Sequence, residues 1–289
     1  MDHLFLVVLS GIASGSVYGL MGLGLVIIYR ATDVVNFALA SLATMAIYVA
    51  YTVEGRGGGV LVGLVAAVIV AAVGGLVVRE VVIRPLGPGQ LFSALVVTMG
   101  VALIVESVVS QVWGTQPRSF PPLVGGTTHV GGSAIANQDL VMIAVAGAAM
   151  TGVAYLFTRT TLGSAMRAVA ESSDTAEIIG ISSQRVARIA WALGLGLAAL
   201  AAGLYAPKSG LTPTVLAAPL FRAFAGIFLG GLTSMYGAVL GGLVIGVLEN
   251  LAATYVSASF RDTFVFALTV GILLIRPQGM FGTRTFERV

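Results

Sequence analysis

Apolar runs that are long enough to cross a lipid bilayer recur along almost the whole sequence. A membrane-spanning helix needs about 20 predominantly apolar residues. The segments that reach or approach this length are 4–29, 34–53, 60–78, 91–112, 139–158, 187–207, 216–232, 237–256 and 262–275. The last is short for a full crossing, and 216–232 is compatible with a bent or re-entrant piece. These nine hydrophobic segments predict an all-α fold, a polytopic transmembrane helical bundle, in a single domain that covers 1–289.

The scarcity of charged residues excludes a soluble protein. Charged residues make up 9% of the sequence and the mean hydropathy is +1.01, whereas a soluble domain carries about 25% charged residues. The sequence has no cysteine, which excludes disulfides, thiolate metal sites and cysteine nucleophiles. Its two histidines, His3 and His129, are too far apart in the sequence to indicate a metal centre. The expected surroundings are the lipid bilayer, and no nucleic-acid partner is expected.

The distribution of Lys and Arg between alternate loops predicts the orientation, because cytoplasmic loops carry an excess of these residues. One set of alternate loops, together with the C-terminal tail, contains Arg30, Arg79, Arg84, Arg159, Arg167, Arg185, Arg188, Arg276, Arg284 and Arg288. The opposite loops contain only Arg56, Arg118, Lys208 and Arg261. With nine crossings, this bias places the N-terminus outside, the C-terminus in the cytoplasm, and the loop 161–181 in the cytoplasm.

The loop 161–181 is a polar, helix-forming stretch between two apolar segments. Ala, Met, Arg and Glu, which favour helices, are frequent in it. Its apolar stripe consists of Leu162, Met166, Val169, Ile178 and Ile179, and its polar faces of Arg167, Glu171, Asp174 and Glu177. This amphipathic pattern predicts one or two short cytoplasmic helices. So much structure in a short loop is typical of a surface that a partner protein binds.

The loop 113–139 is the longest on the predicted outer side. It begins at Trp113, a residue type common at membrane interfaces, and contains Pro117, Pro121 and Pro122. The run Val-Gly-Gly-Thr-Thr-His-Val-Gly-Gly-Ser within it predicts a small hairpin or compact loop. Such a loop either contacts an external partner or serves only as a connection, and connections are the more common case.

Pairs of glycines four positions apart occur in three predicted spans, as Gly15/Gly19, Gly226/Gly230, Gly237/Gly241 and Gly242/Gly246. Small residues at this spacing allow helix backbones to approach closely in lipid. The cluster near the C-terminus predicts a tight helical hairpin that turns at 233–236. The residues predicted to pack its helices are Gly230, Gly237, Gly241, Gly242 and Gly246.

Three charged residues, Glu106, Arg222 and Glu249, interrupt apolar segments. With the predicted orientation, each lies about 8–11 Å below the outer surface, at ~1.5 Å per helical residue. A charge at such a depth costs roughly a few kcal/mol or more unless it is paired or hydrated. Arg222 and Glu249 lie on consecutive segments at matching depth, so we predict an ion pair, which is either structural or part of a substrate contact. Glu106 has no evident partner in the sequence and either faces a watery cavity or is neutral.

A second polar stretch, Arg30-Ala-Thr-Asp-Val-Val-Asn-Phe-Ala, joins the first two apolar segments. Asp33 is predicted to cap the N-terminus of the second segment. Asn36 is predicted to lie in its first turn, near the cytoplasmic mouth of a polar path. Since helix N-termini beside water can bind carboxylates, this stretch is a candidate part of such a path.

Motifs for enzymatic chemistry are absent from the sequence. A phosphate-binding loop of the form G-x-x-x-x-G-K-[ST] is missing, and the only lysine is Lys208, which follows Pro207. A catalytic Ser/His/Asp set is missing too, and His129 is interpreted as a residue of a Gly-rich loop. We therefore expect a chain that is not an enzyme and that has no cofactor of its own.

Four stretches are similar to those of a known family. The stretch 161–181 reads Thr-Leu-Gly-Ser-Ala-Met-Arg-Ala-Val-Ala, with Asp, Ala and Gly-Ile at 174, 176 and 180–181. It resembles the cytoplasmic coupling segment of branched-chain amino-acid ABC transporter permeases of the LivH type. Val-Asn-Phe-Ala in 35–48 resembles the family's Asn-Phe-Ala helix, and 229–249 resembles its Gly-rich hairpin. Arg-Pro-Gln-Gly-Met-Phe-Gly at 276–282 resembles its C-terminal signature.

The resemblance implies one transmembrane permease subunit of an ATP-driven importer in a bacterial or archaeal inner (plasma) membrane. Its partners would be a second, LivM-like permease, two cytoplasmic ATPases that bind ATP and Mg, and an external substrate-binding protein. The coupling segment would lie in a groove of the ATPase through Gly163, Arg167, Ala168, Glu171, Asp174, Ala176, Gly180 and Ile181. The translocation pathway would include Asn36, Phe37, Glu106, Arg222 and Glu249.

Two departures from the family pattern widen the range of expected substrates. Leu39 and Ala40 stand where the family often has a His or polar residue and then Gly. Met235 and Tyr236 stand where its hairpin turn usually has a small residue and Pro. Besides leucine, isoleucine and valine, related importers take urea, short amides, other amino acids or aromatic acids, and this chain fits any of these.

An alternative hypothesis is a secondary transporter or channel that works alone and relays protons through Glu106 and Glu249. The helical cytoplasmic loop and the lack of a clear internal repeat argue against it. A membrane-embedded enzyme is disfavoured by the missing catalytic cluster. A purely structural scaffold leaves the buried charges at a shared depth unexplained.

Overall fold

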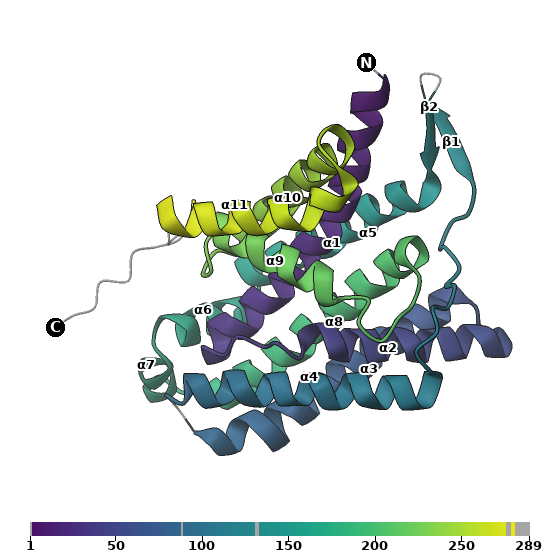
Figure 1. The fold of residues 1–289 in the computed structure, drawn as a ribbon. Helices are drawn as coiled ribbons and strands as arrows, with labels where there is room; N and C mark the ends of the chain where they lie inside the picture. The colour runs from purple at the N-terminus through teal and green to yellow at the C-terminus, as the bar shows by residue number, and fades with distance from the viewer. Residues whose placement is uncertain (1, 88, 131–132, 276–278, 281–289) are drawn as a thin grey trace.

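The computed structural model describes residues 2–87, 89–130, 133–275 and 279–280, and most of this part is helical (Figure 1). Its α-helices are α1 (Asp2–Thr32), α2 (Leu39–Val53), α3 (Val60–Val77), α4 (Leu91–Trp113), α5 (Asn137–Arg159), α6 (Thr161–Glu171), α7 (Ser173–Ile178), α8 (Ser183–Ser209), α9 (Ala217–Gly230), α10 (Met235–Tyr255) and α11 (Arg261–Ile275). Short π and 3₁₀ turns are η1 (Glu54–Gly58), η2 (Val78–Ile83), η3 (Arg84–Leu86) and η4 (Ala258–Phe260). The predicted polytopic helical bundle is confirmed.

Seven of the described helices, some of them counted with a flanking short turn, are long and apolar enough to cross a membrane. The α2 helix has 15 residues and α9 has 14. At ~1.5 Å per residue, α9 is about 21 Å long, which is less than the roughly 30 Å hydrocarbon core of a bilayer. This length fits the bent or re-entrant piece considered for the segment 216–232. The number of crossings and the orientation of the termini stay predictions.

The α1 helix lies at the centre of the packing. It contacts α9 and α10 on one side and α8 on another, and α8 in turn packs against α2 and α3 (Figure 1). Tyr18 of α1 and Trp191 of α8 are among the largest side chains in this interior. Outward-facing apolar side chains stay exposed, for example Leu103 on α4 and Leu61 on α3. Such an inverted surface is what a lipid environment requires.

Glycines allow α10 to lie against two helices at backbone distance. A Cβ added at Gly246 would lie 2.3 Å from Cα of Gly15 on α1, and one added at Gly242 would lie 2.4 Å from the Gly19 amide nitrogen. On the α9 side, Gly230 meets the Gly237 backbone, where an added Cβ would lie 1.9 Å from a carbonyl oxygen. The contact between Gly241 and Gly226 is equally close. All five glycines predicted to pack helices lie in these two contacts, and the hairpin turns between α9 and α10, at the predicted position.

The loop 113–139 contains the predicted hairpin. Strands β1 (Thr127–Val130) and β2 (Ser133–Ala136) are antiparallel, with Thr127 opposite Ala136. The loop is also tied to the segment after α8, because the backbones of Arg118 and Leu211 exchange two hydrogen bonds of 3.0 and 2.8 Å. Figure 1 shows this loop descending from the hairpin along one side of the bundle.

The prediction that Asp33 caps the second apolar segment is wrong. Asp33 has a left-handed backbone (φ 54°), and its amide donates a 2.7 Å hydrogen bond to the Tyr29 carbonyl, so it ends α1. Asp is one of the few residue types that tolerate this conformation. The side chain that serves the next turn is that of Asn36, whose Oδ1 accepts a 3.0 Å hydrogen bond from the Ala38 amide. Of the C-terminal signature, 276–278 and 281–282 lie outside the described residues.

Candidate functional site

The helices of the 161–181 segment begin where side-chain hydroxyls accept hydrogen bonds from their first turns. Thr160 Oγ1 accepts from the Gly163 amide at 3.1 Å, and Ser172 Oγ accepts from the Thr175 amide at 3.2 Å. Ser182 starts α8 in the same way. Each such cap contributes about 1 kcal/mol. The local sequence therefore specifies two short helices followed by α8, rather than one continuous helix.

Glycine ends the second of these helices. Gly180 has φ +85°, and its amide donates to the Glu177 carbonyl at 3.0 Å. The Ile181 amide donates to the Ala176 carbonyl at 2.9 Å. These two bonds form a Schellman motif, which requires a left-handed residue at the position of Gly180. The motif turns the chain from α7 into α8.

The inner face of α6 is fixed to the end of α5. Met166 and Val169 are buried, and Gly163 lies so close to α5 that an added Cβ would be 2.4 Å from the Leu156 carbonyl oxygen. Arg167 donates to the Phe157 carbonyl and, at 3.1 Å, to Ser164 Oγ. The start of α6 is therefore packed directly against the backbone of the end of α5.

The outer face of the segment is apolar at its far end. Ile178 and Ile179 are 84% and 68% exposed. They do not continue the buried stripe of α6, because the helix restarts at Ser173 with a new phase. Asp174 and Glu177 are exposed beside them. Reading one stripe through 161–181 missed this surface, although the Ser-Ser-Asp capping signal for a restart was present in the sequence.

Of the eight residues predicted for ATPase coupling, Gly163 and Ala176 are buried, and Ala168 and Ile181 are half-buried. The other four are exposed: Arg167, Glu171, Asp174 and Gly180. Arg167 and Glu171 line a cavity that also includes Arg30 and Asp33 of the α1 end. Burial raises the pKa of the Asp33 carboxyl above its ordinary value.

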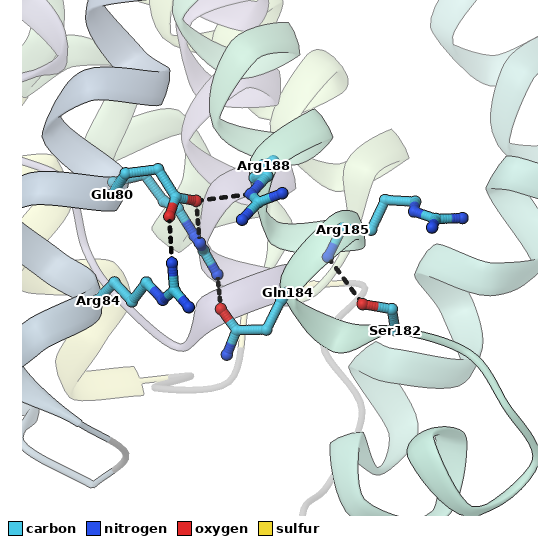
Figure 2. A network of polar contacts seen from close by, with 7 residues as sticks. Glu80, Arg84, Ser182, Gln184, Arg185 and Arg188 are labelled. Atoms are coloured by element: carbon cyan, nitrogen blue, oxygen red, sulfur yellow. Dashed lines mark hydrogen bonds and ion pairs between the residues drawn. The ribbon is translucent and has the colours of Figure 1, made fainter.

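A cluster of charges ties the end of α3 to the start of α8 (Figure 2). Glu80 in η2 accepts from Arg84 at 2.9 Å and from Arg188 of α8 at 2.7 Å. It also pairs with Arg79, whose buried guanidinium donates to Gln184 as well. Sequence reasoning used these arginines for orientation and missed Glu80. Its spacing of four from Arg84 was the available signal.

The predicted pair of intramembrane charges is present. Arg222 Nε lies 3.1 Å from Glu249 Oε1, with side chains that are 9% and 4% exposed. The start of α11 adds two further charges: Asp262 Oδ1 lies 2.6 Å from Arg222 Nη2, and Arg261 Nε lies 3.5 Å from Glu249 Oε1. The guanidinium of Arg222 also lies 5.8 Å from the ring centre of Tyr18. Sequence reasoning missed Asp262 because it lies at the end of a predicted span, where a charged residue is common and does not indicate a buried site.

Arg222 and Asp262 line a cavity of about 680 Å³. The rest of its wall is mainly apolar and includes Phe37, Phe224 and Phe266. The rings of Phe37 and Phe224 have centroids 5.3 Å apart. One cation and one anion at the side of an aromatic pocket match a small zwitterion that carries an apolar side chain.

The other pathway candidates lie apart from this cavity. Asn36 is fully buried and bonds to the backbone before α2, so it does not line the wall. Glu106 accepts a 2.9 Å hydrogen bond from Ser41 Oγ, whereas Glu249 lies behind Arg222. The structure thus places Phe37 and Arg222 in one cavity wall, pairs Glu249 with Arg222, and leaves Asn36 and Glu106 in separate contacts.

Comparisons with known proteins agree over nearly the whole chain. Residues 7–273 match the family model described as "Branched-chain amino acid transport system / permease component". The chain is 29% identical over 295 residues to the high-affinity branched-chain amino acid transport system permease protein LivH of Escherichia coli (strain K12), covering 97% of this chain and 96% of that protein. Its identity to the permease protein BraD of Pseudomonas aeruginosa is 28% over 302 residues, covering 99% and 98%. A probable LivH of Methanocaldococcus jannaschii is 27% identical, covering 91% of this chain and 88% of that protein. A solved structure, PsaBC from Streptococcus pneumoniae in complex with Fab, aligns with a TM-score of 0.45 at 12% identity, covering 93% and 89%.

Proposed function

Because the chain belongs to the permease component family of branched-chain amino acid transport systems, we propose that it is a membrane subunit of an ATP-driven importer for branched-chain or similar amino acids. It forms the path and leaves ATP hydrolysis to two ATPase subunits that bind ATP and Mg. A second, LivM-like permease completes the membrane part, and an external binding protein delivers the substrate. The chain itself is not an enzyme.

The observation that carries this proposal is the exposed pair Ile178 and Ile179 on a rigidly capped segment. Adjacent exposed apolar residues with a polar rim are typical of protein interaction sites. Asp174 and Glu177 beside them supply a polar rim. An ATPase that binds this surface more tightly in one conformation than in the other can drive the permease between two states.

Two routes connect this surface to the membrane part. The first is the backbone contact of Gly163 with the end of α5. The second is the Glu80 cluster, which holds the start of α8 to the end of α3 (Figure 2). Movement of α6 and α7 therefore reaches α5 and α8, both of which pack on α1.

The cavity beside Arg222 supports the substrate class. In the proposal the guanidinium of Arg222 binds the substrate carboxylate and Asp262 binds its ammonium group. The apolar side chain of the substrate then contacts the ring of Phe224 and its neighbours. Urea and short amides lack the two opposite charges and the apolar part, so they fit this cavity less well.

The test is assembly and coupling with an aspartate in the apolar pair. In Ile179→Asp we expect loss of ATPase co-purification and of substrate-stimulated ATP hydrolysis, because the partner groove would have to bury a charge. Thr161→Asp adds the same charge at the exposed first turn of α6, where an acid is favourable, and is expected to behave as wild type. Wild-type assembly by Ile179→Asp, or accumulation of an amino acid by the chain reconstituted alone, would contradict the proposal.

A further inference from the structure

A second cavity, of about 780 Å³, opens on the side of the molecule where α6 lies. Its floor is α1, through Leu23, Tyr29 and Arg30. Its walls are the ends of α5 and α10, which both pack on α1. This cavity is distinct from the one beside Arg222, because the two have no lining residue in common.

One half of this cavity is apolar and the other is charged. The apolar half includes Leu23, Met150, Val153, Phe157 and Val239. The charged half contains Arg30 and Asp33 from the end of α1, and Arg167 and Glu171 from α6. Two guanidinium groups and two carboxylates thus face one space.

These four charges do not satisfy one another. Within the described part of the chain, no ion pair joins Arg30, Asp33, Arg167 or Glu171 to any partner. Among the described residues, the guanidinium of Arg167 donates only to the Phe157 carbonyl and to Ser164 Oγ. A half-enclosed set of charges left in this way suits a ligand that carries both an anionic and a cationic group.

The apolar half continues into the surface that faces lipid. On α10, Tyr236 at the cavity is 62% exposed, and Leu240 and Val244, one and two turns further along the same face, are 48% and 43% exposed. On α5, Tyr155 is 65% exposed. Tyrosines are enriched at the level of the lipid headgroups, so the cavity opens sideways into the bilayer at that level.

We propose that this cavity binds the headgroup of phosphatidylethanolamine, with the lipid phosphate on Arg30 and Arg167 and the primary ammonium on Asp33 and Glu171. Its acyl chains lie along the exposed stripe of Leu240 and Val244. Basic residues in pockets between membrane helices bind the phosphate groups of lipid headgroups, and here two carboxylates lie beside the two arginines. The anionic headgroup of phosphatidylglycerol leaves both carboxylates without a partner. The trimethylammonium of phosphatidylcholine has no N–H to donate to them.

The position of the site gives it a consequence for α6. The bound headgroup contacts α1 through Arg30 and α6 through Arg167, so it holds α6 against α1. The same charges would also suit a free amino acid. The apolar half and its continuation into the bilayer favour the lipid over that soluble zwitterion.

The experiment measures which lipids the purified full chain retains, without any ATPase, so its result is independent of the proposed transport role. The chain in detergent is incubated with equal amounts of phosphatidylethanolamine, phosphatidylglycerol and phosphatidylcholine, and bound lipid is measured by native mass spectrometry. We expect at least about tenfold preference for phosphatidylethanolamine in the wild type, because the other two lipids lose the charge-assisted bonds to the carboxylates. The preference is expected to be lost in Arg30→Gln and kept in Arg159→Gln, a control arginine at the end of α5 outside the cavity.

A second variant tests the roles of the two carboxylates by a gained lipid preference rather than a lost one. Removing both negative charges in Asp33→Asn/Glu171→Gln is expected to shift the preference to phosphatidylglycerol, because the cavity then carries only positive charge. Equal retention of the three lipids by the wild type, or no shift in this variant, overturns the proposal. So does displacement of the lipid by millimolar leucine, because the site would then belong to a soluble amino acid.

Discussion

Glu80 and Arg188 are 108 positions apart in the sequence, yet the Glu80 Oε1 and Arg188 Nε atoms lie 2.7 Å apart. The contact joins the end of α3 to the second turn of α8, directly after the segment that is proposed to bind the ATPase (Figure 2). It places a rigid polar joint between that segment and the transmembrane helices.

We predict that Glu80→Gln uncouples ATP hydrolysis from transport. Glu80 is the acceptor shared by three arginines, and the buried Arg79 depends on it for charge compensation. The assembled transporter is expected to hydrolyse ATP with reduced dependence on substrate, and uptake per ATP is expected to fall. Glu54→Gln, which removes a carboxylate from the loop after α2, serves as the control. Unchanged coupling in Glu80→Gln would assign the cluster a purely structural role.

Single and double substitutions of Arg222 and Glu249 distinguish a structural role of this ion pair from a role in substrate binding. Arg222→Ala leaves the 4% exposed carboxylate of Glu249 with only the more distant Arg261 as a cation, so we expect a destabilisation of up to about 3–5 kcal/mol. In Arg222→Met/Glu249→Met, both charges are gone and packing is kept, and thermal stability is expected to return close to wild type. Uptake is expected to remain lost in this double variant, because the substrate carboxylate has no cation to bind. Recovery of uptake with stability would identify the pair as structural only.

Asp262→Asn tests whether Asp262 binds the ammonium group of the substrate. The side chain of Asp262 is 69% exposed, so this variant is expected to keep wild-type stability. If the carboxylate binds the substrate ammonium, inhibition of uptake by leucine is expected to weaken about tenfold or more, while inhibition by its deaminated 2-oxo analogue changes little. An equal effect on both compounds contradicts the assignment of Asp262 to the ammonium group.

Gly180 tests the Schellman turn between α7 and α8. Gly180→Ala forces an L-residue into φ +85° and is expected to cost about 1–2 kcal/mol. Gly180→Pro also removes the amide that donates to Glu177, so we expect a larger effect and loss of substrate-stimulated ATPase activity. Gly180→Asn tolerates the conformation and is expected to retain most of the activity. Wild-type coupling in the proline variant would exclude a role for this turn.

The glycine contacts between α1 and α10 predict a contrast between two alanine substitutions. Gly246→Ala places a Cβ 2.3 Å from Gly15 Cα, and the overpacking is expected to destabilise the chain by about 1–3 kcal/mol. At Gly147, in the helix α5, an added Cβ meets nothing within 4 Å. Gly147→Ala is therefore expected to keep or slightly raise stability. Thermal unfolding in detergent measures the stability of both variants. Equal midpoints would show that α1 and α10 can move apart to accommodate the added methyl group at little cost.

Much of the architecture could be predicted from local pattern. The apolar segments, the Gly-rich hairpin between α9 and α10, the hairpin in 113–139 and the pair of Arg222 with Glu249 all follow from spacing along the chain. The reason is that a backbone in lipid must satisfy its hydrogen bonds within helices, and that close helix contacts there require small residues. The family resemblance rests on the same local stretches.

Other features depend on which helix faces meet, and here sequence reasoning failed or was silent. It predicted that Asp33 caps the second apolar segment, whereas Asp33 ends α1 in a left-handed conformation and the side chain of Asn36 accepts the hydrogen bond from the Ala38 amide. It placed Ile178 on one apolar stripe with Met166 and Val169, although the restart of the helix at Ser173 leaves Ile178 exposed while those two are buried.

The sequence by itself determined a helical membrane protein, its short capped helices and its intramembrane charges, because these follow from residue types within one or two turns. Only the tertiary structure decided that Glu80 meets Arg188, that Asp262 reaches Arg222, and that two chemically different cavities form. These contacts join residues far apart in the chain. They depend on helix rotation and crossing, which are set by the packing of whole helix faces rather than by local sequence.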